Sequence, residues 1–305
     1  MTMPVMEPDL DATLLRDWAR TIDDGPFSSL CWGERIAFTN PDSLTLLGAL
    51  SAWTERVRLV TTVIVPQLHD PVLLAKALAT GDLLSGGRLA HLLPRRIGAD
   101  RTVVLVPAAY TEPDGQPTAA EHVPVRPRFG EQDAGEKLTE SVLPVGPAPT
   151  QPGGPPLLVG TIGPKTVRSA ASWAEGLAGI TMDLDVAKQN ELFDVARDAW
   201  QQAGRAKPHL ATSFWFALGD REQARDQVRR HLLRYMNWIP AEYVEAMAPT
   251  TGWAGSEDEL AEVLRAFAAV GTGEVHLIPT SSDLGQLRCV ADVVADVVAE
   301  VSRAG

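Results

Sequence analysis

Residues 54–89 read TERVRLVTTVIVPQLHDPVLLAKALATGDLLSGGRL, and this stretch decides the fold class. Its apolar and β-branched run, Val57 to Val65, has the composition of a buried strand. A helix is expected over Pro71 to Leu84, because Asp70 can cap its first turn and proline is tolerated at the first helical position. This helix should end at Ser85-Gly86-Gly87, where glycine can adopt the left-handed cap conformation. The stretch therefore predicts one strand followed by one helix.

The same alternation of strand and helix continues in both directions along the chain. Short apolar runs predict the other strands, and apolar residues spaced along one helix face predict the other helices. Strands are expected at residues 2–6, 29–33, 88–93, 157–160, 176–182, 210–218 and 274–279. Helices are expected at 10–22, 41–54, 164–173, 184–203, 220–238, 256–270 and 283–302. This alternation predicts a parallel sheet with helices packed outside it.

Two α/β architectures satisfy this pattern: an open doubly wound sheet and a closed (β/α)8 TIM barrel. A dinucleotide site in an open sheet needs a Gly-x-Gly-x-x-Gly turn after the first strand, whereas the first strand here runs into Val5-Met6-Glu7-Pro8. Seven strands can be counted, some of them weak, and residues 88–93 could supply an eighth. We therefore predict a single barrel domain over residues 1–305, with its chemistry on the loops that follow the strands.

Composition narrows the class of protein. The 27 Lys and Arg residues are outnumbered by 39 Asp and Glu, which gives a net charge of −12 and argues against nucleic-acid binding. No run approaches the ~18–20 apolar residues of a membrane span, and Met1-Thr2-Met3-Pro4 does not start like a secretory signal. Cys31 and Cys289 are too few for a disulfide scaffold, and the histidines lack metal-ligand spacing. We expect a cytoplasmic enzyme without a metal, a membrane or a nucleic acid as partner.

Several motifs, taken in order, resemble one family. They are Val63-Ile64-Val65-Pro66, the residues 69–76 and 83–89, and, much later, 155–160, 163–166 and 171–174. Together they resemble the bacterial luciferase-like family of flavin-dependent oxidoreductases, and the resemblance covers residues 1–89 and 143–305. It implies a (β/α)8 barrel, FMN or coenzyme F420 as cofactor, a small organic substrate and a homodimer. The activity it implies is that of a monooxygenase or a hydride-transferring reductase.

Two segments are the expected cofactor site. Residues 160–166, which are Gly160, Thr161, Ile162, Gly163, Pro164, Lys165 and Thr166, close a strand and open a helix, so that backbone N–H groups and the helix dipole could hold a phosphate. The other reading is a tight Gly-Pro turn with no ligand. Val63 and Ile64 end the strand where the family resemblance implies a bulge, commonly with a non-proline cis peptide, behind the flavin ring. A buried strand that simply ends at Pro66 explains these letters equally well.

Candidate catalytic residues follow the strands. Glu34 is expected to point into the barrel mouth as a general acid or base, or to form a salt bridge with Arg35 or Arg58. His69 titrates near neutrality and could bond a substrate or the flavin. Among the other polar residues, Glu7 could also face the ring or substrate, whereas His276 is expected to be a hydrogen-bonded barrel residue. A flavin-independent cyclase or isomerase that uses Glu34 and His69 is the alternative function.

Aromatic residues gather in the C-terminal half. Phe214 and Phe216 should share one face of their strand, with Trp215 on the other face. Residues 235–240, followed by Trp253, are expected to cross the barrel mouth, where they could line an apolar pocket, cover the core or contact another subunit.

The stretch at about 90–142 departs from the family pattern. The irregular proline-rich segment spans 94–156, and 11 of the 23 prolines fall between Pro107 and Pro156, which forbids one continuous helix there. The fourth β/α unit is therefore expected to be degenerate or rebuilt. The segment could be a specialised lid or substrate wall, the mark of a lost flavin site, or the product of a local reading-frame change.

Overall fold

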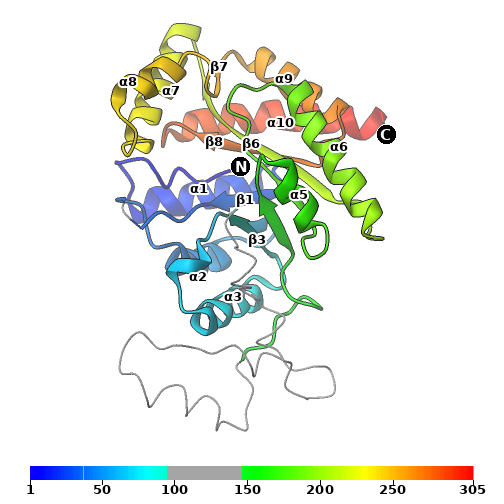
Figure 1. Ribbon diagram of the computed structural model, residues 1–305. Helices are drawn as coiled ribbons and strands as arrows, with labels where there is room; N and C mark the ends of the chain where they lie inside the picture. The colour runs from blue at the N-terminus through cyan, green and yellow to red at the C-terminus, as the bar shows by residue number, and fades with distance from the viewer. Residues whose placement is uncertain (37, 95–145, 305) are drawn as a thin grey trace.

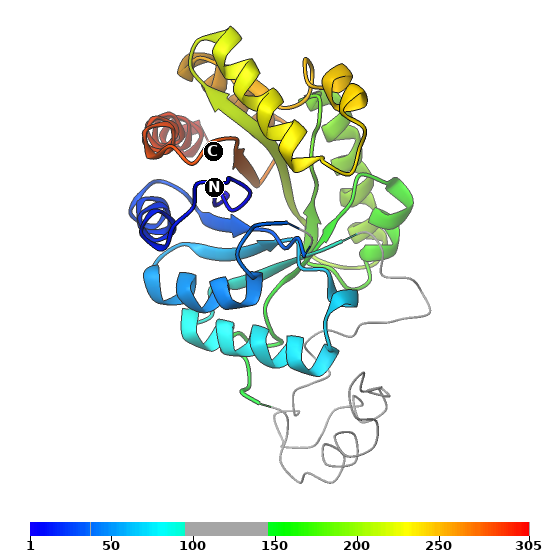
Figure 2. The same cartoon turned by 90° about the vertical axis from the view of Figure 1, so that its left-hand side faces the viewer.

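The computed structural model describes residues 1–36, 38–94 and 146–304 (Figure 1). Most of the segment at 94–156, and with it the expected rebuilding of the fourth β/α unit, lies outside the described residues. In both views the helices lie around the outside of the strands, which occupy the centre of the molecule (Figure 2). The predicted α/β architecture is confirmed in the part of the chain that the structure describes.

The described strands form one parallel sheet of eight. The order β1-β2-β3-β4-β5-β6-β7 follows the chain, and β8 pairs with β6 over most of its length while β7 pairs with the end of β6. Their bounds are β1 Ser29–Trp32, β2 Arg58–Thr62, β3 Leu89–Pro94, β4 Leu157–Gly160, β5 Gly176–Ala178, β6 His209–Leu218, β7 Trp253–Gly255 and β8 Glu274–Pro279.

The N-terminal segment closes this sheet into a barrel. The backbone N–H of Thr2 donates to the carbonyl of Leu277 in β8 at 2.9 Å. One residue further, Met3 donates to the carbonyl of Cys31 in β1 at 2.8 Å, and Thr2 forms a parallel bridge with Cys31. The expected strand at residues 2–6 is thus an isolated bridge, but it lies between β8 and β1 as a barrel requires.

Helices cover the strands, and side chains cap several of them. Asp70 accepts hydrogen bonds from the N–H groups of Val72 and Leu73, and Gly86 ends the same helix with φ of 68°. Both features were predicted from residues 54–89. The bounds are α1 Ala12–Asp24, α2 Ser43–Trp53, η1 Pro66–Leu68, α3 Pro71–Ser85, α5 Pro164–Ala170, α6 Val186–Gln202, α7 Arg221–Tyr235, α8 Ala241–Met247, α9 Glu257–Ala269 and α10 Leu284–Ala304.

Two elements, β7 and α8, were not predicted. The helix α7 ends at Tyr235, and α8 and β7 follow it, so residues 235–253 are not the simple excursion over the mouth that the sequence suggested. Trp253 lies in β7, pairs with Phe216 and packs in the core, which is one of the roles that the sequence left open. Tyr235 lines the cavity, which is another of them. A strand of three residues is too short to show an alternating pattern, which explains why it was missed.

The strands separate an outer core from the barrel interior. Phe214 and Phe216 face outward, where Phe214 stacks against Phe267 of α9 with ring centroids 6.0 Å apart. Trp215 faces the opposite side, as predicted, and lines a cavity. Inside the barrel, Cys31 packs against Val60 and Ala90 from the neighbouring strands β2 and β3.

Candidate functional site

A cavity of about 380 Å³ lies at the carboxyl ends of the strands, the end at which barrels of this kind carry their chemistry. Its size is in the range of small-molecule sites. It is bounded by the N-terminal segment, by the ends of β1, β2, β4, β5, β6 and β8, and by α7. The lining residues are Thr2, Met3, Pro4, Val5, Met6, Gly33, Thr62, Val63, Gly160, Thr161, Ile162, Ala178, Gly179, Ile180, Ser213, Trp215, His231, Tyr235, His276, Ile278 and Pro279.

The end of β2 forms one wall. The peptide bond between Thr62 and Val63 is cis, and the carbonyl of Val63 accepts the N–H of Glu34 at 3.0 Å. Gly33 is required beside it, because a Cβ at this position would lie 2.6 Å from the carbonyl oxygen of Thr62. Of the two residues expected behind a flavin ring, Val63 lines the cavity, whereas Ile64 is buried in the outer core.

The β4 turn forms a second wall. Gly160, Thr161 and Ile162 line the cavity. The Thr161 hydroxyl accepts the N–H of Gly163 at 3.0 Å, and Gly163 precedes the first turn of α5. The other expected phosphate ligands, Lys165 and Thr166, lie within that first turn and are not among the lining residues.

Glu34 and His69 come together, as a pair rather than as separate groups. The Nε2 of His69 lies 2.6 Å from Oε1 of Glu34, and Oε2 of Glu34 accepts the N–H of Val65 at 2.8 Å. Neither residue is among those that line the cavity. The expected salt bridge of Glu34 with Arg35 or Arg58 does not form.

Those two arginines have other partners. Arg58 binds Glu274 at 2.6 Å. The guanidinium of Arg35 lies over the rings of Phe38 and Trp238, at 4.4 and 4.5 Å from the centroids. Arg35 thus makes cation–π contacts at the barrel mouth instead of neutralising a carboxylate.

A second carboxylate–histidine pair lies in the wall of the cavity. Nδ1 of His231 in α7 lies 2.7 Å from Oε1 of Glu7, and Arg234 also donates to Glu7. The His231 side chain is 2% exposed, and its Nε2 has no hydrogen-bond partner. Burial lowers the pKa of His231, and the hydrogen bond to Glu7 offsets only part of this effect. His231 is therefore neutral at pH 7.

The floor of the cavity carries a third arrangement. Glu274 in β8 accepts hydrogen bonds from the hydroxyls of Ser28 and Ser29 and pairs with Arg58. His276, 2% exposed, places Nε2 3.3 Å from Oε2 of Glu274. Burial alone would lower the pKa of His276, but Cys31 and Glu274 outweigh it and raise the pKa to about 9.

The pKa of Glu274 is shifted as well. Burial opposes its ionisation, but hydrogen bonds from His209 and His276 and the charges of His276 and Arg58 hold its pKa far below the usual range. The floor is therefore charged, and it includes the histidine that was expected to be only a barrel residue.

His231 is the site residue that sequence reasoning missed. It had been considered only for metal binding, where its spacing is unfavourable. One signal was present: residues 224, 228 and 232 of the same helix are apolar and buried, and His231 falls on that face. A histidine on the buried face of a helix indicates a polar partner in the interior.

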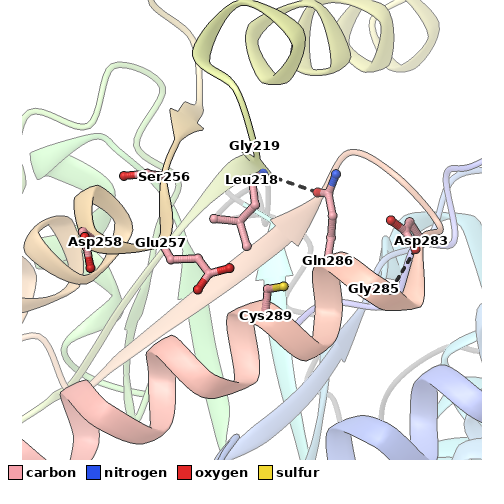
Figure 3. A pocket seen from close by; sticks show the side chains of 9 residues that line it. All are labelled: Leu218, Gly219, Ser256, Glu257, Asp258, Asp283, Gly285, Gln286 and Cys289. Carbon is pink, nitrogen blue, oxygen red and sulfur yellow. Dashed lines mark hydrogen bonds between the residues drawn. The ribbon is translucent and has the colours of Figure 1, made fainter.

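A larger hollow of about 640 Å³ lies outside the barrel, between the starts of α9 and α10 (Figure 3). Gln286 occupies part of its wall and accepts the N–H of Leu218 at 3.4 Å. Burial raises the pKa of the Cys289 thiol, and the nearby carboxylates, Glu257 first, raise it further. A protonated thiol is a poor nucleophile, so this hollow offers less chemistry than the strand-end cavity.

The described residues hold neither a metal-binding cluster nor a membrane-spanning helix. Across 1–36, 38–94 and 146–304, no cluster of three or more His, Cys, Asp or Glu side chains is arranged to hold a metal ion. None of the helices in these ranges is long and apolar enough to span a bilayer.

The chain is similar to known proteins both in sequence and in fold. The profile of the luciferase-like monooxygenase family matches residues 5–98 and 129–277. An uncharacterized protein of Mycobacterium tuberculosis is 33% identical over 171 residues, which is 54% of this chain and 57% of the relative. The match therefore spans little more than half the length of the curated relatives.

Three solved structures share the fold over nearly the whole chain. The monooxygenase RslO1 of Streptomyces bottropensis superposes with a TM-score of 0.68 at 19% identity, covering 97% of this chain and 98% of that one. An F420-dependent secondary alcohol dehydrogenase, solved with an F420–acetone adduct, has a TM-score of 0.67 at 16% identity, covering 93% and 94%. The oxygenating constituent of 3,6-diketocamphane monooxygenase of Pseudomonas putida, solved with FMN, has a TM-score of 0.62 at 16% identity, covering 96% of each chain.

Proposed function

This chain belongs to the luciferase-like monooxygenase family, and from that premise we propose that it is an oxidoreductase using FMN or coenzyme F420 on a small organic substrate. The observation that carries the proposal is the cavity at the strand ends, with the cis peptide Thr62–Val63 in one wall and Gly160 to Ile162 in another. Proteins that share the fold are described with F420 or with FMN, which supports both cofactors equally.

The cavity has the character that such a cofactor requires. Its walls are largely apolar and include Val63, Trp215 and Ile278, which suits the face of a planar ring system. Two of its residues, Thr2 and His231, each keep a buried polar atom without a hydrogen-bond partner, which suits the polar edges of a ligand. A bound flavin or deazaflavin supplies hydride transfer, and a flavin can also activate oxygen.

We assign the holding of the cofactor to the residues expected from the sequence. Val63 would support the ring from the end of β2, and Ile64, buried in the outer core, would hold that backbone in place. Gly160, Thr161 and Ile162 would present backbone N–H groups to the phosphate, with Lys165 and Thr166 as further donors from the first turn of α5. Gly163, whose N–H is bonded to the Thr161 hydroxyl, would shape the turn. Glycine at 160 and 163 permits a close approach of backbone to ligand.

The catalytic role expected of Glu34 and His69 stays a prediction. Their contacts support a positioning role, because Glu34 binds the N–H of Val65 and the carboxylate in turn contacts His69. Through these contacts the pair would fix the backbone that follows Val63. On this account, Glu34→Gln should weaken cofactor binding more than it changes the rate of the loaded enzyme.

Cofactor titration tests the proposal. The purified full chain should bind FMN, reduced FMN or reduced F420, as followed by calorimetry. A folded sample that binds none of them would overturn the oxidoreductase function and favour a flavin-independent barrel enzyme.

Glycine variants test the assigned site. Gly160→Ala should weaken cofactor binding at least about tenfold, which corresponds to about 1.4 kcal/mol. The control is Gly273→Ala at the start of β8, where the added Cβ would meet its nearest atom, the carbonyl oxygen of Leu210, at 3.4 Å. Equal affinities of the two variants for the cofactor would contradict the proposal that its phosphate binds at the β4 turn.

The homodimer and the cytoplasmic location belong to the same proposal. A groove of about 360 Å³ between α2 and α3 is lined mostly by apolar residues, which are Leu44, Leu47, Gly48, Leu73, Ala77, Gly81 and Leu84, together with Lys76 and Thr80. Leu73 is 67% exposed. A second copy of the chain would cover this apolar face. Leu73→Glu should yield a monomer in light scattering, whereas Val298→Glu on α10, 50% exposed in the wild type, should not.

A further inference from the structure

We propose that Glu7 and His231 form the proton-transfer pair of the strand-end cavity, in which Nε2 of His231 accepts the proton of a hydroxyl group on a neutral, largely apolar substrate. This inference rests on the proposed oxidoreductase function and names the substrate class for that same cavity. His231 lies in the helix α7 and not on one of the loops that follow the strands.

The contacts of Glu7 determine which nitrogen of His231 carries the proton. Arg234 donates to Oε1 of Glu7, and Nδ1 of His231 lies 2.7 Å from the same oxygen. An ionised carboxylate only accepts hydrogen bonds, so Nδ1 must be the protonated nitrogen. Because a neutral imidazole has one donor and one acceptor, Nε2 is left with its lone pair.

That lone pair is buried and unused. Nε2 of His231 has no hydrogen-bond partner among the described residues, although the side chain is 2% exposed and lines the cavity. The ring is fixed in place, because Tyr235 stacks on it at 5.9 Å with an interplanar angle of 11°. A preorganised acceptor that lacks a partner in the free protein gains one when a ligand supplies a donor.

The surroundings select the kind of donor. Arg234 lies 3.4 Å from Nδ1 of His231. His276, whose pKa is raised to about 9, contributes a second positive charge to the lining. Both cations are paired with carboxylates, Arg234 with Glu7 and His276 with Glu274, so they leave little net charge for a ligand. The lining residues include no carboxylate that could bind an ammonium group, and a carboxylate ligand has no proton to offer at pH 7. Together with the apolar walls, this leaves a neutral molecule with a hydroxyl group.

The proton step balances with hydride transfer. In the oxidative direction, the substrate carbon that bears the hydroxyl would give up a hydride, for which a bound oxidised flavin or deazaflavin would supply the acceptor. The O–H bond breaks, its proton passes to Nε2, and its electron pair becomes the second bond of the carbonyl. Glu7 stabilises the imidazolium that results, as a carboxylate does in a catalytic triad. In the reductive direction the same imidazolium returns the proton.

Histidine NMR on the cofactor-free protein is the first test. In protein labelled with ¹⁵N-histidine, His231 should be a neutral imidazole with the proton on Nδ1 at pH 7. The spectrum of His231→Gln assigns the signal by its loss. A proton on Nε2, or an imidazolium at pH 7, would overturn the proposal.

A pair of matched probes is the second test. 2-Naphthol and 2-methoxynaphthalene have the same ring system, but only the first has a hydroxyl proton. In calorimetry the wild type should bind 2-naphthol at least tenfold more tightly than the ether, and His231→Phe should bind both within about threefold. Equal affinities in the wild type, or no binding of either probe, would overturn the proposal even if the Phe variant fails to fold.

A control variant separates this result from a general effect on α7. Arg230→Phe changes the neighbouring position, where the side chain is 64% exposed, and should keep the wild-type preference for 2-naphthol. Failure of the proposed function is distinguishable, because it shows as lost FMN and F420 binding while the tautomer and the probe preference remain. The reverse outcome, intact cofactor binding with no preference between the probes, rejects the proton-transfer pair alone.

Discussion

Two histidines line the same cavity, and each lies beside a glutamate, yet one is neutral and the other is an imidazolium. His231 in the wall is neutral because burial lowers its pKa, and the cation Arg234 nearby adds to that effect. His276 in the floor is an imidazolium, because Cys31 and Glu274 outweigh burial and raise its pKa to about 9. The two side chains are equally buried, at 2% exposure, so burial alone does not explain the difference.

The difference lies in what else surrounds each pair. Glu7 is shared between His231 and Arg234, so its charge is already matched by an arginine. In the floor, the sulfur of Cys31 is a further group that favours the charged form of His276, and His276 in turn lowers the pKa of Cys31. A carboxylate next to a histidine therefore does not by itself predict an imidazolium, because the net charge of the cluster decides it.

Removing the two glutamates should separate the regions most strongly. Glu274→Ala leaves the His276 cation buried without its carboxylate, and we expect a loss of about 3–5 kcal/mol in the free energy of unfolding. Glu7→Ala leaves a neutral histidine and a partly exposed arginine, so about 1–3 kcal/mol is expected. Urea unfolding measures both. Glu300→Ala, which removes an exposed pair with Arg265, should leave stability unchanged within error. Equal losses at Glu274 and Glu7 would contradict the assigned charge states.

The fall in the free energy of unfolding at alkaline pH, here called the alkaline limb, should originate at His276 in the floor of the cavity. Between the ordinary pKa of 6.5 and about 9, folded His276 holds a proton that the unfolded chain has released. Its contribution is complete below pH 6.5 and falls as the pH rises to 9, by at most about 1.4 kcal/mol per pH unit. The lowered pKa of Cys31 acts in the opposite sense and offsets part of this fall. Urea unfolding at a series of pH values should show this slope in the wild type and not in His276→Asn. A slope that persists in the variant would place its origin elsewhere.

The fall in the free energy of unfolding at acid pH, here called the acid limb, should originate in part at His231 in the wall of the cavity. Folded His231 resists protonation, so between pH 6.5 and its lowered pKa the unfolded chain binds the extra proton, and stability falls as the pH falls. His231→Gln should reduce this slope by up to about 1.4 kcal/mol per pH unit. His91, 1% exposed with its pKa lowered by burial to about 3, contributes in the same direction and keeps a limb in the variant. Above pH 4.5, His276→Asn should leave the acid limb as it is, whereas below pH 4.5 it should reduce the part that comes from the lowered pKa of Glu274.

The smallest expected effect sharpens the cause of the difference. Arg234→Gln removes the cation next to His231, so the pKa of His231 should rise, only slightly because Arg234 is partly exposed. An NMR pH titration of the histidine signals measures it. The pKa of His276 should not move in the same sample, and a joint shift would show that the two regions are coupled.

The barrel could largely be predicted because its evidence is local. The strand Val57 to Val65, the Asp70 cap and the Gly86 stop all depend on neighbouring residues, and each is present in the structure, with the strand shortened to Arg58–Thr62. The β4 turn is equally local, and Gly160 does line the cavity. Short or uncapped pieces such as β7 left no comparable pattern.

The site could be predicted only in part because its polar contacts are distant in sequence. Glu34 and His69, which are 35 residues apart on consecutive loops, were both singled out, and they do meet. Glu7 and His231 are 224 residues apart, and only closure of the barrel and packing of α7 bring them together. Charge states depend on a third and a fourth residue, so they follow from the packed structure and not from spacing.

Closure of the barrel by the segment around Thr2 also constrains the order of events during synthesis. Residues 2 and 3 bond to β8 on one side and to β1 on the other, and Ser29 binds Glu274, which is 245 residues later. A growing chain cannot make these contacts until β8 has left the ribosome, and the loop that they close is among the longest the chain can form. The first strands must therefore wait with one edge open, which makes the nascent chain dependent on protection from association until its last strand arrives.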